Sequence, residues 1–412
     1  MMISIAGREI DEDDDAALAL LAHAHERKIR PLCLCRKPYP QLQIAHMGEH
    51  YFVKRLPRDS GAHALQCERF EIPLSLSGKV ACAGKSILDD QKSDGVEIKL
   101  AVALQPGKRV APATTASPAS NTVKAAPSRL SLFGLVNFLW EEAGLCEWRP
   151  QFKGRRFWGV VSNRLNAALP GKSSKTFGYE HIAYIPAAFD PANPDVNGRA
   201  RLAKTHRAIG DRHRMIFIGE FKELTQGKFG PILKLKHVDC AITVADELKR
   251  RMLSRFQAEF ALCDAHSRMR LIACCLVDFN KAGYPALAEI GFLTVSPEWL
   301  PFASEADAML IQTLVDSDRS FTKTLRYDLP DEAVIASAIL KDTGPQGVAL
   351  FLDDGSNSDG SRQALQDCPM QTWVWNILEP MPPLPRARSR ANVGRPPAEG
   401  HKVPAASGSS SP

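Results

Sequence analysis

The sequence predicts a multidomain α+β protein, and three observations support this fold class. At 412 residues the chain is too long for one small hydrophobic core, so two or three domains are expected. A stretch rich in Pro, Ala, Ser and Thr at residues 106–128 lacks the apolar spacing of a helix or a strand. On both sides of this stretch, helical apolar spacing and short strand-like runs occur together, which is typical of mixed architectures.

Composition shifts divide the chain into five parts. A cysteine-containing module at 1–105 is separated from the rest by a flexible linker at 106–128. A basic helical segment follows at 129–211, and a mixed α/β domain occupies 212–380. We expect the basic tail at 381–412 to be disordered, because it cannot bury enough apolar surface to offset its ordering entropy.

The N-terminal module is predicted to be a small α+β unit. Acidic residues lead into the Ala/Leu run of DEDDDAALALLAHAHERKIRP, as the positive end of a helix dipole prefers, and Pro31 ends this helix. Strands are predicted at HYFVKRL, ERFEIPLSL and GVEIKLAVAL. The two cysteine-bearing segments of the module therefore bracket a hairpin.

The basic segment is predicted to contain two amphipathic helices. Apolar residues recur at helical spacing in SRLSLFGLVNFLWEEAGL, and Gly144 is a natural C-cap. A second helix in GRRFWGVVSNRLNAALPG stops at Pro170, and KTFGYEHIAYIP behind it is predicted to form a strand or hairpin. One interpretation is a helix-turn-helix, winged by the hairpin. The alternative is a generic helical pair without a nucleic-acid role.

Strands are predicted to begin the region from residue 212 onward. HRMIFIGEFKEL and GPILKLKHV precede one helix in ADELKRRMLSRFQAEFALC, and two further strands lie in RLIACCLVDFNKAGYPALAEIGFLTVS. A helix in SEADAMLIQTLVDS and several short strands complete this mixed α/β region.

The N-terminal module carries a set of soft metal ligands. A Cys-x-Cys pair supplies two thiolates, and a His-x-x-x-Cys motif supplies an imidazole and a third thiolate. Together they make one tetrahedral set of ligands that suits zinc. Zinc in such a site is expected to be structural, because no carboxylate base has an obvious place beside it. His46 and His50 compete for the fourth position, and buried apolar thiols are the alternative interpretation of the cysteines. The predicted ligands are Cys33, Cys35, His63 and Cys67.

Charge is unevenly distributed along the chain. Residues 129–238 hold 18 Lys and Arg against 9 Asp and Glu, whereas residues 295–379 hold 5 against 14. A basic middle favours a polyanionic partner, and an acidic C-terminal region favours a protein partner, although charge scatter on a solvated surface would look similar. Arginine and lysine reach phosphates, and asparagine can pair with adenine. The candidate nucleic-acid contacts are Arg155, Arg156, Asn163, Arg164, Lys172 and Lys175.

A metal-dependent nuclease is the enzymatic alternative. In restriction-endonuclease-like cores an acidic residue precedes a Glu/Asp-x-Lys triplet, whose carboxylates hold Mg²⁺. Asp331 follows a proline and precedes Asp353 at the end of a predicted strand, but no lysine completes the triplet. Glu220 and Lys222 form a triplet without an acidic partner just before it. The incomplete ligand sets favour a degenerate version of this core over an active one.

The N-terminal cysteines also carry a family resemblance. Cys33, Cys35 and Cys67, together with LWEEAGLCEWRPQFKGRRFWGVV and RSFTKTLRYDLP, resemble an uncharacterised bacterial family, domain of unknown function 1173. The resemblance covers most of the chain except the basic tail. It implies that the three cysteines act together. It gives no information on whether His63 is a ligand, and it implies no activity.

These observations predict a cytoplasmic protein of the bacterial type. The acidic N-terminal stretch is neither a secretory signal nor a transit peptide, no apolar run approaches membrane-spanning length, and cysteines in apolar runs are typical of reduced thiols. We expect a non-enzymatic, zinc-containing nucleic-acid-binding or accessory protein. A protein-interaction scaffold that uses the acidic region is a further alternative.

Overall fold

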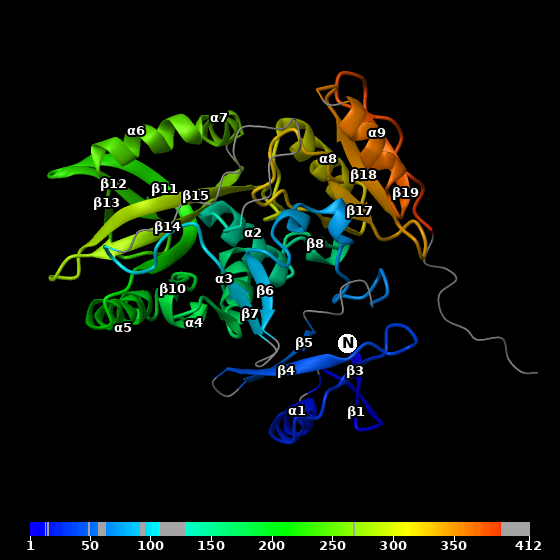
Figure 1. Ribbon diagram of the computed structural model, residues 1–412, viewed down its shortest axis with the longest axis horizontal. Coiled ribbons are helices and arrows are strands. Elements are labelled where there is room, and N and C mark those ends of the chain that lie inside the picture. Colours follow the sequence, from blue (N-terminus) through cyan, green and yellow to red (C-terminus); the bar gives the residue numbers. More distant parts are fainter. Residues whose placement is uncertain are drawn as a thin grey trace, which may run out of the picture.

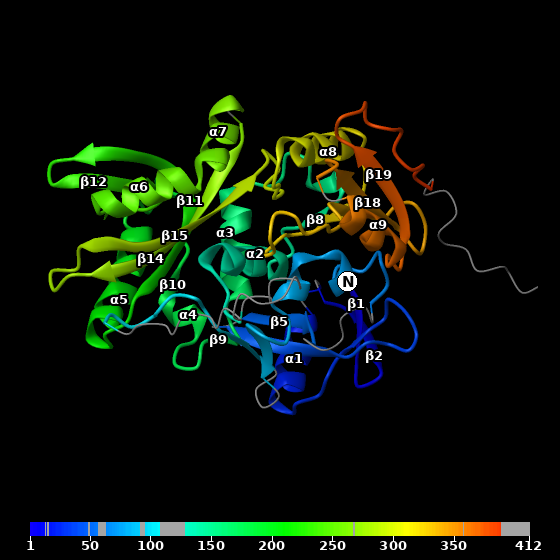
Figure 2. The same ribbon diagram turned by 45° about the horizontal axis from the view of Figure 1, so that its top comes forward.

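The structure is a computed structural model that describes residues 1–12, 14, 16–47, 50–56, 63–90, 95–107, 128–266, 268–356 and 358–388. Helices and several separate sheets occur within these ranges, so the mixed α+β class is confirmed. Both views show the N-terminal module against the middle of the chain, with a strand-rich body on one side and the C-terminal sheet on the other (Figures 1 and 2). No helix in the described ranges has the length and apolar character that a membrane crossing requires.

The N-terminal module contains a three-stranded antiparallel sheet, one helix and a hairpin. The sheet has the order β2-β1-β3, and α1 packs against the β4–β5 hairpin. A small core of aliphatic side chains around Ile3, Leu21 and Leu42 joins these elements. The hairpin lies between the two cysteine-bearing segments, as predicted. The elements are β1 (Met2–Ile5), β2 (Arg8–Asp11), α1 (Ala17–Glu26), β3 (Leu32–Cys33), β4 (Leu42–Met47) and β5 (His50–Arg55).

The strand predicted at ERFEIPLSL was wrong. Residues 68–73 form no strand, and a 3-10 turn, η1 (Leu74–Leu76), begins directly after Pro73. Proline has no N–H to donate to a strand ladder, so the apolar residues around it turn inward without pairing. After η2 (Gly78–Ala81), the chain forms β6 (Ile87–Asp90) and β7 (Gly95–Ile98).

Helix α2 (Leu132–Glu142) lies at the centre of the molecule. Its first turn is capped by the Ser131 hydroxyl, which accepts from the Gly134 N–H at 3.0 Å. Most of its side chains are buried on every face, which is expected of a helix inside a large core. It contacts α3 (Trp158–Ala168) and two long strands, β14 (Arg270–Phe279) and β15 (Pro285–Val295).

The connection between α2 and α3 departs from a helix-turn-helix. Residues 143–157 contain a short strand, β8 (Glu147–Trp148), and a 3-10 turn, η3 (Pro150–Phe152), where that motif has a turn of three or four residues. The segment behind α3, predicted to be a strand or hairpin, contains a four-residue helix, α4 (Tyr179–Ile182), followed by the two-residue strand β10 (Ala183–Tyr184). A longer helix, α5 (Val196–Gly210), then leads into the large sheet.

The largest sheet closes into a five-stranded barrel. Its strands follow the order β11-β12-β13-β15-β14, and β14 pairs back onto β11, with β10 added outside. The helix predicted at 245–263 is two helices that break at Phe256. Both helices lie between the third and fourth barrel strands in sequence. The elements are β11 (Met215–Gly227), β12 (Gly230–Leu235), β13 (Ile242–Thr243), α6 (Asp246–Arg255), α7 (Gln257–Ala265), β14 (Arg270–Phe279) and β15 (Pro285–Val295).

The C-terminal region forms a second sheet, in the order β19-β18-β17-β16-β8. Its edge strand β8 comes from the basic segment, so this sheet joins two parts of the chain that composition separated. The helix predicted at 304–317 is confirmed as α8. The elements are α8 (Glu305–Asp316), β16 (Phe321–Lys323), β17 (Ala338–Leu340), β18 (Val348–Asp353), α9 (Ser358–Gln366) and β19 (Gln371–Asn376).

The predicted linker and the predicted tail lie largely outside the described residues. Most of the linker at 106–128 lies outside the described residues, as does the tail from 389 onward. Residues 381–388 differ from the predicted disorder because they pack on the C-terminal sheet. The Pro383 carbonyl accepts from the Trp373 indole N–H at 3.0 Å, and the Arg388 N–H donates to the Asp342 carbonyl at 2.8 Å.

Candidate metal centre

The four predicted metal ligands lie together in the structure. Cys33 ends β3, where it pairs with Ile3, and Cys35 follows after one residue. His63 and Cys67 lie on a turn, in which the Cys67 N–H donates to the Ala64 carbonyl at 2.9 Å. One ligand atom from each of the four side chains falls within 4.8 Å of the others.

The spacing of these atoms fits a tetrahedral metal ion. The Sγ atoms of Cys33 and Cys67 are 3.7 Å apart, and Nδ1 of His63 lies 3.5 Å from Sγ of Cys35 and 3.6 Å from Sγ of Cys67. Metal–sulfur bonds of about 2.3 Å and metal–nitrogen bonds of about 2.0–2.1 Å give tetrahedral edges of about 3.8 Å and about 3.6 Å, respectively. The cluster therefore could hold a metal ion.

Backbone N–H groups prepare two of the thiols for coordination. The Ala64 N–H points at Sγ of Cys35 and the Arg69 N–H at Sγ of Cys67, each at 3.4 Å, and such donors stabilise thiolates. The hydrogen bond from Cys67 lowers the pKa of Cys33 to about 3 and raises that of Cys67 itself. In contrast, burial raises the pKa of Cys274, a thiol in the barrel core, so it remains an inert apolar group.

His63, and not the competing His46, lies in the cluster. His63 is 2% exposed and faces the thiols, whereas His46 is exposed and stacks on Tyr51 with ring centroids 4.5 Å apart. The side chain of His50 lies outside the described residues. The histidine that the resemblance left open is therefore His63.

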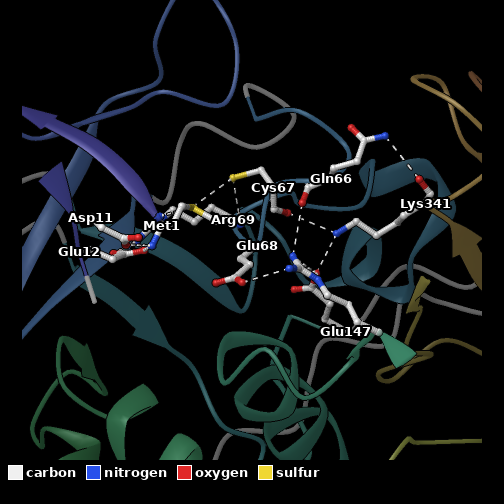
Figure 3. Close-up of polar contacts among 10 residues, drawn as sticks. Met1, Asp11, Glu12, Gln66, Cys67, Glu68, Arg69, Glu147 and Lys341 are labelled. Atoms are coloured by element: carbon white, nitrogen blue, oxygen red, sulfur yellow. Dashed lines mark hydrogen bonds and ion pairs between the residues drawn. The ribbon is translucent and has the colours of Figure 1, made fainter. Parts of the chain in front are cut away.

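The Cys67 turn also connects the N-terminal module to the rest of the chain (Figure 3). Sδ of Met1 lies 4.0 Å from Sγ of Cys67, and Arg69 donates to the same Sδ at 2.8 Å. On the other side, the Lys341 ammonium donates to the Cys67 carbonyl at 3.3 Å and pairs with Glu147 at 3.2 Å. The cluster is thus joined to both the N-terminal sheet and the C-terminal sheet.

A buried charge cluster lines a cavity of about 1000 Å³ beside the metal centre. Glu142, the last residue of α2, pairs with Arg55 at 2.8 Å and with Lys172 at 2.9 Å. Lys79 pairs with Glu71 at 2.6 Å and with Glu141 at 3.2 Å. Sequence reasoning missed this cluster because its members are far apart in the chain and share no motif.

One comparison with known proteins gave a match, and it covers most of the chain. A family model described as "Protein of unknown function (DUF1173)" matches residues 3–377. The chain belongs to this family. Comparison with curated proteins gave no match, and neither did comparison with solved structures. The DUF1173 match includes the three N-terminal cysteines, so the resemblance that they suggested is confirmed.

The six predicted nucleic-acid contacts of this DUF1173 protein separate into two groups. Arg155, Asn163, Arg164 and Lys175 are exposed on or beside α3. Arg156 instead donates to the Leu145 and Glu147 carbonyls and lies over the rings of Trp148 and Phe152. Lys172 is buried against Glu142. Four of the six side chains therefore remain accessible to a polyanion.

The predicted nuclease residues are not gathered into one group. Glu220 is buried in β11 between Lys236 at 2.6 Å and Arg270 at 3.6 Å, while Lys222 is exposed two residues later. Asp331 is exposed in a loop, and Asp353 at the end of β18 accepts from the Gly355 N–H at 3.1 Å. Among the described residues, only the cysteine–histidine cluster brings three or more metal-ligating side chains together.

A basic cleft lies beside Glu220. The cavity has a volume of about 390 Å³ and is lined by residues from β11, from the start of β14 and from the segment before α3. Four of its lining side chains are cationic and two are acidic, so an anion would meet an excess of positive charge. The charged lining residues are Arg156, Glu220, Lys236, Arg268, Arg270 and Glu298.

Proposed function

We propose that this chain is a non-enzymatic nucleic-acid-binding protein whose N-terminal module is held by a structural zinc ion. The connectivity of the closed barrel carries the proposal. The third and fifth barrel strands, β13 and β15, run parallel, β14 closes onto β11, and helices lie between the third and fourth strands. This is the connectivity of OB-fold barrels, which bind oligonucleotides and oligosaccharides.

Charge favours an oligonucleotide over an oligosaccharide. A fold alone does not determine which ligand a protein binds, so the choice between the two is argued from the charge of the surface. Residues 129–238, which supply α3 and the first half of the barrel, hold 18 cationic against 9 acidic side chains. The basic cleft and the exposed Arg155 and Arg164 are the matching local features. Lysine and arginine at such density are suited to phosphate contacts.

Zinc is the metal that suits the cluster best. Three thiolates and one imidazole are soft and borderline ligands, which select zinc over magnesium or calcium. Four protein ligands would complete the tetrahedron and leave no open position for water or substrate, as in structural sites. The zinc ion would hold the Cys33 strand and the Cys67 turn in place, and through the Lys341 contact it would support the attachment of the module to the C-terminal sheet.

The test is binding of labelled DNA and RNA, both single-stranded and duplex, by fluorescence anisotropy at several salt concentrations. We expect affinity to fall steeply with salt, because binding releases counterions from phosphates. Charge reversal in an Arg155→Glu/Arg164→Glu variant should weaken binding. It should also make the dependence of log affinity on log salt shallower, by about 1 for each phosphate that the variant no longer binds.

Arg8→Glu is the matched control, since Arg8 is also exposed but lies on β2, outside the basic segment. This variant should bind as the unmodified chain does. Binding that is insensitive to salt, or an equal decrease in affinity in both variants, would contradict a nucleic-acid interface on the basic segment.

A further inference from the structure

Two turns of the barrel share an unusual composition. The β11–β12 turn, residues 226–230, has the sequence QGKFG, and the β14–β15 turn, residues 280–284, has the sequence NKAGY. Each contains one lysine, one aromatic residue and glycine, and neither contains an acidic residue. Phe229 is 93% exposed and Tyr284 is 68% exposed. Rings of this size usually bury most of their surface, so two of them at turn tips, each beside a lysine, are candidate ligand contacts.

The register of the barrel places these two turns on either side of the short strand β13, the β11–β12 turn near its C-terminal end and the β14–β15 turn near its N-terminal end. Thr243 of β13 pairs with Ile232 of β12 on one side and with Ala286 of β15 on the other. Its hydroxyl donates to the Pro285 carbonyl at 3.0 Å, and the Val244 N–H donates to the Pro231 carbonyl at 2.9 Å. Ile232 and Ala286, each two residues after its turn, are therefore two strand spacings apart, about 10 Å. Both views show the two hairpins projecting from the same end of the molecule (Figures 1 and 2).

The face between the turns is short and uncharged at its centre. Thr243 is exposed and Ile232 is half-buried there, while Lys228 and Lys281 stand exposed on the two turns. The Lys228 ammonium lies 5.3 Å from the centroid of the Phe229 ring, so a cation and a ring are presented together. A strand of nucleic acid needs both groups: cations for its phosphates and rings for its bases.

We propose that the β12–β13 face, bounded by these two turns, binds single-stranded nucleic acid. Phe229 and Tyr284 stack on unpaired bases, and Lys228 and Lys281 contact the backbone phosphates. Duplex bases are already stacked on one another and leave no face for these rings, so the site discriminates for single strands. This inference rests on the proposed function and adds to it the strandedness of the ligand and the residues that recognise it.

The experiment compares the full chain with a Phe229→Ala/Tyr284→Ala variant. The probes are labelled oligothymidylate and oligouridylate of about 20 nucleotides, which separate DNA from RNA, and a duplex of the same length. We expect each ring to contribute a factor of about 5 to 100 to single-strand affinity, while duplex affinity stays unchanged. Phe229→Trp should retain single-strand affinity, because indole also stacks.

Phe189→Ala is the matched control, since Phe189 is 57% exposed in the segment between β10 and α5. The inference is overturned if the double variant binds single strands as tightly as the unmodified chain, or if Phe189→Ala weakens binding equally. If the unmodified chain binds neither single strands nor duplex at low salt, the proposed function fails as well. If it binds both without regard to Phe229 and Tyr284, the inference alone fails.

Discussion

The Cys33, Cys35, His63 and Cys67 cluster shows what residue-scale patterns in this chain can predict. Two short motifs each place two ligands within one turn of backbone, so only one long-range contact, between β3 and the Cys67 turn, has to form. Each motif is local, and residue types alone identify it. The choice of His63 over His46 was not available from spacing, because it depends on which side of the hairpin faces the thiols.

Removal of the metal ligands tests this cluster directly. Elemental analysis should find about one zinc per chain in protein purified without chelator, and none after Cys33→Ser/Cys35→Ser. His63→Ala should lower zinc content and the midpoint of thermal unfolding, whereas His46→Ala should change neither, because the His46 ring points toward Tyr51 and His25. Full zinc content in the His63 variant would show that another group supplies the fourth ligand.

The charged residues were harder to predict than the cysteines. Lys172 and Arg156 occur in a basic stretch, yet one pairs with Glu142 and the other donates to two backbone carbonyls. A sequence shows that a cation is present but not whether a distant carboxylate will be buried beside it. The cluster around Glu142 could not be predicted for the same reason, because its partner Arg55 is 87 residues away in the chain.

Lys54 provides a pH-dependent test of the charged cavity. Burial, with a contribution from nearby Lys172, lowers the pKa of Lys54 to about 8 in the folded protein from 10.5. Below pH 8 the ammonium is charged in both folded and unfolded states, so its burial penalty is fully present. Between pH 8 and 10.5 the folded state loses the proton first, and the penalty is relieved.

The free energy of unfolding of the unmodified chain, relative to a Lys54→Met variant, should therefore rise with pH over this window. We expect a rise of about 1–3 kcal/mol, at about 1.36 kcal/mol for each pKa unit. Urea denaturation at several pH values measures the difference. Lys85→Met, at an exposed position, should show no such trend. A flat difference for Lys54→Met would mean that the ammonium is solvated.

At the scale of elements, long periodic segments were predictable and short ones were not. The helices around Leu135 and Leu310 can be predicted from the spacing of their apolar residues and from their capping residues alone. The strand predicted at ERFEIPLSL failed because Pro73 cannot pair, and the single helix predicted after β13 breaks at Phe256 to follow the barrel. The barrel itself is set by pairings such as Met215 with Val277, which no local pattern contains.

The contact of α2 with the barrel depends on one glycine. A Cβ on Gly291 of β15 would lie 2.6 Å from the Phe133 backbone N and 3.0 Å from the Leu132 carbonyl carbon. Backbone in the first turn of a buried helix cannot easily move aside, so Gly291→Ala should destabilise the protein by about 1–3 kcal/mol or more. Urea denaturation monitored by circular dichroism gives this value.

The same substitution at Gly210 is the control. Gly210 ends α5, and a Cβ there meets nothing within 4 Å. Gly210→Ala should therefore be neutral or stabilise by up to about 1 kcal/mol, because alanine restricts the unfolded chain more than glycine does. Equal effects of the two substitutions would show that α2 adjusts its distance from β15.

At the scale of the whole molecule, the predicted division at the linker is crossed by folded structure. β7, before the linker, pairs in parallel with β9 (Lys172–Ser173), after it. The Gly78 N–H donates to the Leu325 carbonyl at 2.8 Å. Ile98 and Leu100 share one hydrophobic core with Leu130 and Leu135. Composition located a change in the chain, but a change in composition does not require two separate cores.

A cut within the linker should therefore leave the protein in one piece. With a protease site in place of residues 113–119, cleavage should give two fragments that co-elute in gel filtration and separate only in denaturant. The shared core and the buried pairs of Glu142 with Arg55 and of Glu141 with Lys79 hold them, since parting them would expose apolar surface and unpaired charges. A Glu142→Gln change in the cleaved protein should weaken this association, because it removes the ion pair that Arg55 of the first fragment makes with Glu142 of the second. Fragments that separate under native conditions would mean that residues 1–105 form an independent domain after all, as composition alone suggested.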